Sequence, residues 1–277
     1  MNGIGFGGLD AALTVAGWLD LVGSVVLVGG LLYGALVAPP SRQGARSLRT
    51  AIMLVVIGLA LQFGFTALRM EDVSDVRGLR LVVDLVETRW GTLWMLRAFG
   101  LAVLASRARM VAVAAPPWLL LRSLQGHPGA HGVVPALVDW LHLAAAAAWI
   151  GGLVQLALAG PVVPVAVAQR VRTIATAAVA VVLPAGVYGA LLHVHSWRML
   201  FSTPYGRTLM VKLALVPVLL ALGAANHFRH VPAVARDEAA ASADLARNVR
   251  AEIVLAAAVL LCSALLGVLP MPHVHPG

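Results

Sequence analysis

Charged side chains are scarce in this sequence. Only 12% of its 277 residues are Asp, Glu, Lys or Arg, whereas soluble domains usually carry about 25%. A soluble protein of this length exposes enough surface to need many more charges, so a soluble enzyme and a nucleic-acid-binding protein are both excluded. With 60% hydrophobic residues and a mean hydropathy of +0.90, the sequence predicts an all-α membrane protein whose main partner is the lipid bilayer.

Cysteine is nearly absent too. Cys262 is the single cysteine, which excludes an intramolecular disulfide and a CxxC metal site. The sequence also has no P-loop, no phosphorylated-aspartate motif and no nucleophile triad. An ATP-driven pump is therefore disfavoured and no enzyme is expected, and any transport would have to be passive or coupled to an ion.

Long apolar runs are abundant. A helix needs roughly 20 apolar residues to cross a bilayer core. Eight runs indicate eight transmembrane helices: 11–37, 48–68, 90–106, 109–124, 136–159, 171–193, 206–228 and 251–269. The fourth run is the weakest, because Pro116 and Pro117 interrupt its helical hydrogen bonding.

The basic residues indicate the orientation of these helices. Eleven of the 20 Lys and Arg residues fall in the connections after the first, third, fifth and seventh runs, and seven fall on the other side. Because loops rich in Lys and Arg stay in the cytoplasm, the bias predicts that both termini lie outside it. Most histidines then fall in extracytoplasmic loops or the tail: His127, His131, His193, His195, His273 and His275.

An internal repeat divides the chain. The segment from Trp18 to Leu31 matches the segment from Trp140 to Leu153 without a gap, and Thr88–Arg97 matches Thr203–Lys212. We expect two four-helix halves of the same topology, residues 1–125 and 133–277, related by an axis along the membrane normal. The repeat pairs Asp20 with His142, Arg97 with Lys212 and Met95 with Met210.

The extracytoplasmic His and Met residues suit a copper ion, Cu(I) or Cu(II), because imidazole binds both states and thioether binds Cu(I). His193 and His195 can face one ion, with Met199 nearby, only if the backbone there is extended; the sixth helix is therefore predicted to end near His193. Further candidate ligands are His142, Asp20, Met95, Met210, His127 and His131. Each also has an ordinary structural interpretation: Asp20 and Arg97 can neutralise each other, methionine fills gaps, and a His-Pro-Gly loop forms turns.

Several blocks of the sequence together resemble one family. They are Asp139–Leu143 with Trp149–Leu153, Gly186–Gly189, Thr203–Arg207 with Lys212, Ala225–Asn226, and Arg247, Arg250 and Glu252 at the predicted start of the last helix. In these blocks the chain resembles the copper resistance protein D family, CopD or PcoD, most densely over residues 139–252. The resemblance implies an eight-helix protein of the bacterial inner membrane that moves copper from the periplasm toward the cytoplasm. It also implies a periplasmic copper-binding partner of the CopC type, expected here as a separate chain.

Two other functions remain open from the sequence. Helix-borne histidines can ligate haem, as in a b-type cytochrome-like membrane oxidoreductase. The chain could also be a subunit that only docks a periplasmic copper chaperone, in which case it would move no copper by itself.

Overall fold

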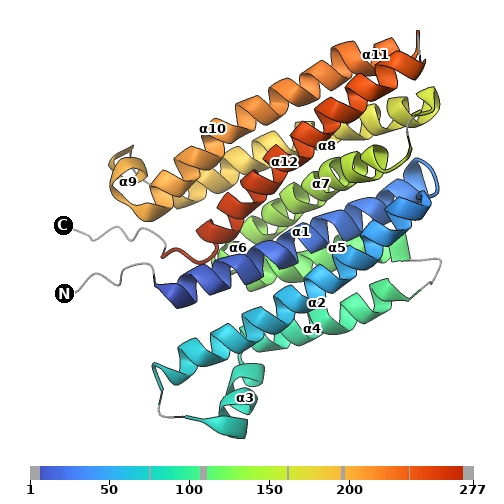
Figure 1. The fold of residues 1–277 in the computed structure, drawn as a ribbon. Helices are drawn as coiled ribbons and strands as arrows, with labels where there is room; N and C mark the ends of the chain where they lie inside the picture. The colour runs from blue at the N-terminus through green and yellow to red at the C-terminus, as the bar shows by residue number, and fades with distance from the viewer. Residues whose placement is uncertain are drawn as a thin grey trace.

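The computed structural model describes residues 7–74, 76–106, 111–160, 162–194, 197–236 and 238–270, without the side chains of residues 193 and 238–240. Over these residues the chain is helical, with no strand (Figure 1). The helices are α1 (Gly8–Leu36), α2 (Arg42–Glu71), α3 (Gly78–Glu87), α4 (Arg89–Ala105), α5 (Val111–Gln125), α6 (His127–Ala130), α7 (Val133–Ala157), α8 (Val165–His193), α9 (Trp197–Ser202), α10 (Pro204–Ala225), the π-helix η1 (Asn226–His230), α11 (Val231–Val234) and α12 (Glu238–Leu266).

The long helices run side by side in one elongated bundle (Figure 1). The short helices α3, α6 and α9 lie at the same end as the start of α1 and the end of α12, and we call this the terminal end. The connections from α1 to α2 and from α7 to α8 lie at the opposite end, as do η1 and α11. Every long helix therefore links one end of the bundle to the other.

Six helices are long and apolar enough to cross a membrane, among the described residues: α1, α2, α7, α8, α10 with its continuation to Val234, and α12. The chain is thus a multi-pass membrane protein. Each of the eight predicted ranges falls on a helix, but α4 and α5 have only 17 and 15 residues. At 1.5 Å per residue they reach about 26 Å and 23 Å, less than the roughly 30 Å hydrocarbon core.

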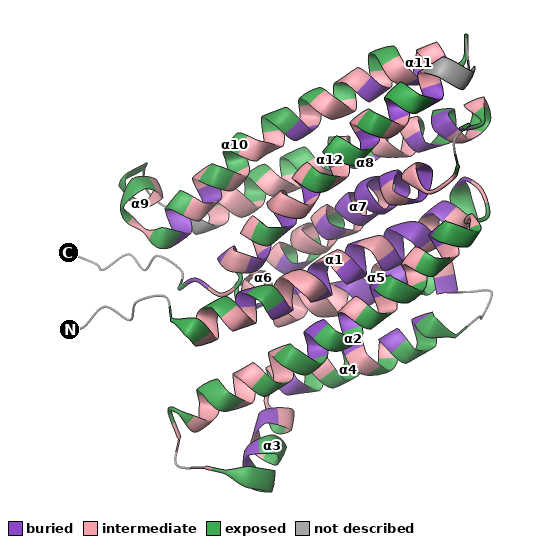
Figure 2. Ribbon diagram, in the orientation of Figure 1, coloured by how far each residue is buried: buried purple, intermediate pink, exposed green. Residues whose placement is uncertain are grey.

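The central helices α1 and α7 approach each other very closely. A Cβ atom on Gly29 would lie 1.9 Å from the carbonyl oxygen of Ala147, and one on Gly151 would lie 2.6 Å from the Cα atom of Gly29. Only glycine fits such a backbone contact. Buried residues are concentrated on α1 and α7, and exposed ones on the outer helices α8 and α10 (Figure 2).

Two tryptophans that the repeat pairs make matching contacts. Trp18 on α1 donates its indole N–H to the carbonyl of Ala257 on α12, at 3.0 Å. Trp140 on α7 donates to the carbonyl of Pro116 on α5, at 2.7 Å. In each case the hydrogen bond joins the first long helix of one expected half to the last helix of the other. A buried indole N–H usually has such an acceptor, because the rest of the ring is apolar.

Helix ends differ from the expectation in places. α8 ends at His193 and Val194 is extended, with φ −114° and ψ 101°, which confirms the predicted end of this helix. The last helix begins at Glu238 rather than at 251, so Glu252 lies well inside α12 and not at its start. The short helix α3 between α2 and α4 was not predicted, because its ten residues are too few to stand out as an apolar run.

Candidate functional site

Asp20 lies inside a cluster of paired charges in the amino-terminal part of the bundle. Arg97 on α4 donates from Nη2 to one carboxylate oxygen of Asp20 at 2.7 Å, and Arg122 on α5 donates to the other oxygen. Asp20 and Arg97 are 0% and 1% exposed. We call Asp20, Arg97 and Arg122 the Asp20 cluster. Any cation that approached this carboxylate would have to compete with two guanidinium groups for it.

Neutral groups complete the surroundings of Arg97. Its Nη1 donates to the side-chain oxygen of Gln125 at 3.1 Å, and its guanidinium carbon lies 5.4 Å from the centre of the Trp118 ring. The structural interpretation of Asp20 and Arg97, mutual neutralisation across a helix interface, agrees with these contacts. The cluster joins α1, α4 and α5 into one unit.

His142, the repeat counterpart of Asp20, has different surroundings. Its Nδ1 lies 2.9 Å from the carbonyl oxygen of Val182 on α8. A carbonyl can only accept, so Nδ1 carries the proton and the neutral ring presents an unprotonated Nε2. No hydrogen bond to Nε2 is present within the described residues. Metal-binding histidines usually have this arrangement, in which the second ring nitrogen is held by a backbone carbonyl.

Two charged side chains lie near His142. Lys212 on α10 and Asp139, one turn earlier on α7, both interact with it electrostatically, and Lys212 interacts with Asp139 and Cys262 as well. Asp139 also lies within electrostatic reach of Arg122. We call Asp139, His142 and Lys212 the His142 group. Unlike the Asp20 cluster, it contains no close ion pair within the described residues.

The other predicted copper ligands are spread over the terminal end and the outer halves of helices. His127 and His131 flank the short helix α6, Met199 is half-buried in α9, Met95 on α4 is 41% exposed and Met210 on α10 is half-buried. The backbone of His193 ends α8, whereas its side chain and all of His195 lie outside the described residues, as do His273 and His275. Among the residues described, no three His, Cys, Asp or Glu side chains converge to hold a metal ion.

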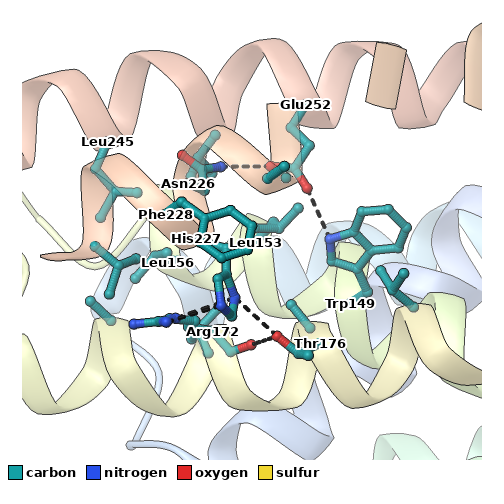
Figure 3. A pocket seen from close by; sticks show the side chains of 18 of the residues that line it. Trp149, Leu153, Leu156, Arg172, Thr176, Asn226, His227, Phe228, Leu245 and Glu252 are labelled. Carbon is teal, nitrogen blue, oxygen red and sulfur yellow. Dashed lines mark hydrogen bonds between the residues drawn. The ribbon is translucent and has the colours of Figure 1, made fainter. Parts of the chain in front are cut away.

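A second polar region lies nearer the opposite end, around a cavity of about 270 Å³. Its walls come from α7, α8, α10, η1, α11 and α12 and are mostly apolar. Glu252, 1% exposed, borders it (Figure 3). One carboxylate oxygen accepts from the Trp149 indole at 2.9 Å and the other from the Asn226 amide at 2.6 Å. We call this the Glu252 cavity.

Across the cavity, His227 connects η1 to α8. Its imidazole faces Arg172 and Thr176, with the Arg172 Nη2 at 2.9 Å from Nε2 and the Thr176 hydroxyl at 3.1 Å from Nδ1 (Figure 3). The π-helix that carries Asn226 and His227 widens the turn locally, a feature that recurs at functional sites. The cavity thus has an acidic group on one wall and basic groups on the other.

Sequence reasoning missed this region as a site. Glu252 and Asn226 belonged to the blocks that resemble the copper resistance protein D family, but Glu252 was placed at a helix start, where an acid is unremarkable at the membrane surface. A usable signal was present: Glu252 is followed by apolar residues through Leu261 and preceded by the helix-forming run from Glu238. The partners Trp149, Arg172 and His227 come from other helices, so no local pattern could have identified them.

Comparison with known proteins bears on the carboxyl-terminal part of the chain. Residues 165–266 match the family model of CopD, copper resistance protein D. The resemblance to the CopD family is confirmed over this segment. We call residues 165–266 the CopD segment. It contains Lys212, Asn226, His227 and Glu252, together with the Val182 carbonyl that accepts from His142.

A curated relative supports the same relationship. The chain is 30% identical over 164 residues to "Copper transport protein CutJ" of Bacillus subtilis (strain 168), a match that covers 56% of this chain and 29% of the relative. The chain therefore corresponds to less than a third of that protein's length. No solved structure matches the chain. The matched family and the matched relative are thus both named for copper resistance or copper transport.

Proposed function

We propose that this chain moves copper across the bacterial inner membrane, from the periplasm to the cytoplasm. Support comes from the CopD segment, from the relative named as a copper transport protein, and from the six helices suited to cross a membrane. In this proposal the terminal end faces the periplasm, because the connections at the opposite end carry the larger share of Arg residues. A periplasmic copper-binding protein of the CopC type delivers the ion there.

The orientation of the His142 ring is the observation that most directly supports a copper path. Its Nδ1–H donates to the Val182 carbonyl, and Nε2, a lone-pair donor inside a candidate membrane-spanning helix, has no hydrogen bond within the described residues. An intramembrane ionisable side chain costs roughly 2.5–3.5 kcal/mol on insertion scales and is generally retained for a function. In the proposal, Nε2 is the copper ligand. Asp139 offsets the repulsion between the passing cation and Lys212.

The proposed path begins at the terminal end of α8. His193 and His195, with Met199, form the proposed entry site, for which the extended backbone at Val194 is a requirement of the proposal. Val182 lies eleven residues before His193, so His142 is about 16 Å deeper than the entry site at 1.5 Å per residue. Met210, six residues into α10, lies at an intermediate depth and is proposed as a soft ligand between them.

Removal of the His142 imidazole tests this proposal. Purified protein in proteoliposomes should take up copper, and His142→Ala should lower the initial rate at least about tenfold, which corresponds to about 1.4 kcal/mol of lost stabilisation. His230→Ala is the matched control, since it deletes an imidazole from η1 at the opposite end and should leave uptake unchanged. Both variants should elute as folded protein on size exclusion. Equal uptake by His142→Ala and wild type would contradict the role of His142.

The same preparation separates the alternative functions. A docking subunit would take up no copper when reconstituted alone. A b-type cytochrome would show a Soret band with sharp reduced α and β bands in the visible spectrum. We expect copper uptake without such bands.

A further inference from the structure

Glu252 is a buried acid without a cation partner. It lies within the membrane-spanning part of α12, and no Lys or Arg pairs with it among the described residues. Its two hydrogen bonds come from neutral donors, the indole of Trp149 and the amide of Asn226. The Asp20 cluster shows that this bundle can supply two guanidinium groups to a buried acid. No guanidinium group pairs with Glu252 among the described residues, so the burial of this acid needs a different explanation.

The donors around Glu252 are themselves held in place. Asn248, one turn earlier on α12, donates its amide to the side-chain oxygen of Asn226 at 2.8 Å and to the carbonyl of Leu222 at 3.0 Å. Because the Asn226 oxygen is used in this way, its NH2 group must face Glu252. These hydrogen bonds keep the carboxyl group in one position at the cavity wall. Because the donors are neutral, they do not fix its protonation state.

Other charged groups near α12 are engaged elsewhere. Arg172 and His227 share the Glu252 cavity but bond to each other on the wall opposite Glu252. On helices packed against α12, Asp20 of α1 is paired with arginines, and Asp139, His142 and Lys212 form the His142 group near the terminal end. Arg229 and His230 on η1 and the near neighbours Asp244, Arg247 and Arg250 on α12 make no hydrogen bond to Glu252. Since no described cation is bonded to Glu252, its charge is left to be balanced by a mobile cation.

The cavity gives such a cation access. Its volume of about 270 Å³ has room for several water molecules, since one occupies about 30 Å³ in the liquid. The carboxyl group borders this space, which lies toward the end of the bundle assigned to the cytoplasm. Water in the cavity can carry a proton to and from a carboxylate oxygen.

A proton suits this site better than copper. Cu(I) prefers sulfur and imidazole nitrogen, whereas the groups that touch the Glu252 carboxyl are an indole N–H and an amide N–H, which are donors and cannot bind a metal. The one imidazole on the cavity wall, His227, faces the positive charge of Arg172. A carboxylate needs no further ligand to take up a proton.

We propose that Glu252 binds the coupling proton of copper transport. In one half of the cycle a carboxylate oxygen takes a proton from water connected to one side of the membrane, and in the other half it returns that proton to water connected to the opposite side, so that each copper ion moved is accompanied by the transfer of one proton. This inference rests on the proposed transport function. It adds to that function an energy source that the sequence left open.

Copper accumulation in proteoliposomes under an imposed pH gradient tests the inference, with the membrane potential clamped at zero. For one proton per copper ion, a gradient of one pH unit should change the steady-state accumulation ratio about tenfold, because a tenfold ratio corresponds to 1.4 kcal/mol. Glu252→Gln, which keeps the shape and removes the exchangeable proton, should abolish this response. Glu252→Asp should retain part of it, and Glu87→Gln, an exposed change on α3, should retain all of it.

A measurement without copper separates the two proposals. Infrared difference spectra of wild-type protein between acidic and alkaline pH should contain a carboxylic acid band that is lost in Glu252→Gln and kept in Glu87→Gln. Copper uptake that ignores the pH gradient, or a Glu252→Gln variant that responds like wild type, would overturn the coupling role. If wild-type protein takes up no copper at any gradient, the transport function fails, and the infrared band alone then decides whether Glu252 exchanges a proton.

Discussion

The Asp20 cluster and the His142 group occupy matching places in the repeat. Both place ionisable side chains inside the bundle, but the partners of these side chains differ. In the first, Asp20 meets Arg97 and Arg122 in close ion pairs, and Ser24 adds a hydroxyl at 3.3 Å. In the second, His142 and Lys212 replace the acid and the arginine, and the imidazole bonds to a backbone carbonyl instead. In the Asp20 cluster the carboxylate is paired with two arginines of the same cluster. In the His142 group, the Nε2 atom of His142 has no hydrogen bond within the described residues.

This difference assigns different tasks to the two regions. A buried carboxylate whose two oxygens both accept from arginines holds helices together but offers little to a passing ion. The carboxyl-terminal region, which contains the CopD segment, has both the open His142 nitrogen and the unpaired Glu252. We infer that the amino-terminal half serves as scaffold and the carboxyl-terminal half carries the chemistry.

The largest expected effect is at Asp20. Asp20→Ala leaves Arg97 and Arg122 buried without a counter-charge, and the loss of one partner of a buried pair costs about 3–5 kcal/mol. Thermal unfolding in detergent should show a correspondingly lower midpoint. Asp10→Ala is the control on the same helix, because its pair with Arg69 is partly exposed and should contribute about 1 kcal/mol or less. Similar losses for Asp20→Ala and His142→Ala would erase the distinction between the two regions.

A smaller effect is expected where α1 and α7 touch. Gly151→Ala places a methyl group 2.6 Å from the Gly29 Cα atom, and such overpacking costs about 1–3 kcal/mol. At the adjacent Gly152 an added Cβ meets nothing within 4 Å, so Gly152→Ala should be neutral or stabilise the helix by up to about 1 kcal/mol. Unfolding midpoints of the two variants should therefore shift in opposite directions, or only that of Gly151→Ala should fall. A tolerated Gly151→Ala would show that the two central helices can separate.

The smallest effects are expected at two matched helix starts. The Thr88 hydroxyl accepts from the Gly91 N–H at 3.0 Å, and the Thr203 hydroxyl accepts from the Gly206 N–H at 2.9 Å. Thr88→Ala and Thr203→Ala should each cost about 1 kcal/mol, the usual value for a lost N-cap. The two losses of unfolding free energy should be equal. A marked inequality would mean that the halves share sequence here but not energetics.

Much of the fold could be predicted from apolar run length alone. Each of the eight predicted ranges overlaps a helix, because a stretch that must satisfy its backbone in lipid has few other options, but only six helices of the described residues are long and apolar enough to cross a membrane. Prediction was weaker where a helix continues beyond the apolar run: α12 starts at Glu238, in a stretch of Ala and charged residues that hydropathy does not mark. The division into halves 1–125 and 133–277 and the placement of both termini outside stay predictions.

The sites were harder to predict, because the decisive partners are distant in the sequence. His142 was identified as an intramembrane imidazole, but its bond to Val182 depends on how α7 packs on α8. Asp20 was paired with Arg97 in one of the two interpretations considered, while the second partner, Arg122, lies near the end of the fourth predicted range and was not considered as a partner. The π-helix at Asn226–His230 has no sequence signature in this chain. Its first three residues nevertheless border the Glu252 cavity.

The contact between Gly29 and Gly151 limits where an ion can travel. With backbones this close at the middle of the bundle, there is no space for even a dehydrated ion between α1 and α7 at that level. The protein therefore cannot work as a central pore shared by two equal halves, as a symmetric channel would. Under the proposed transport function, the ion path therefore lies to one side of the glycine contact, and a blocker directed at the axis of the bundle should not inhibit uptake.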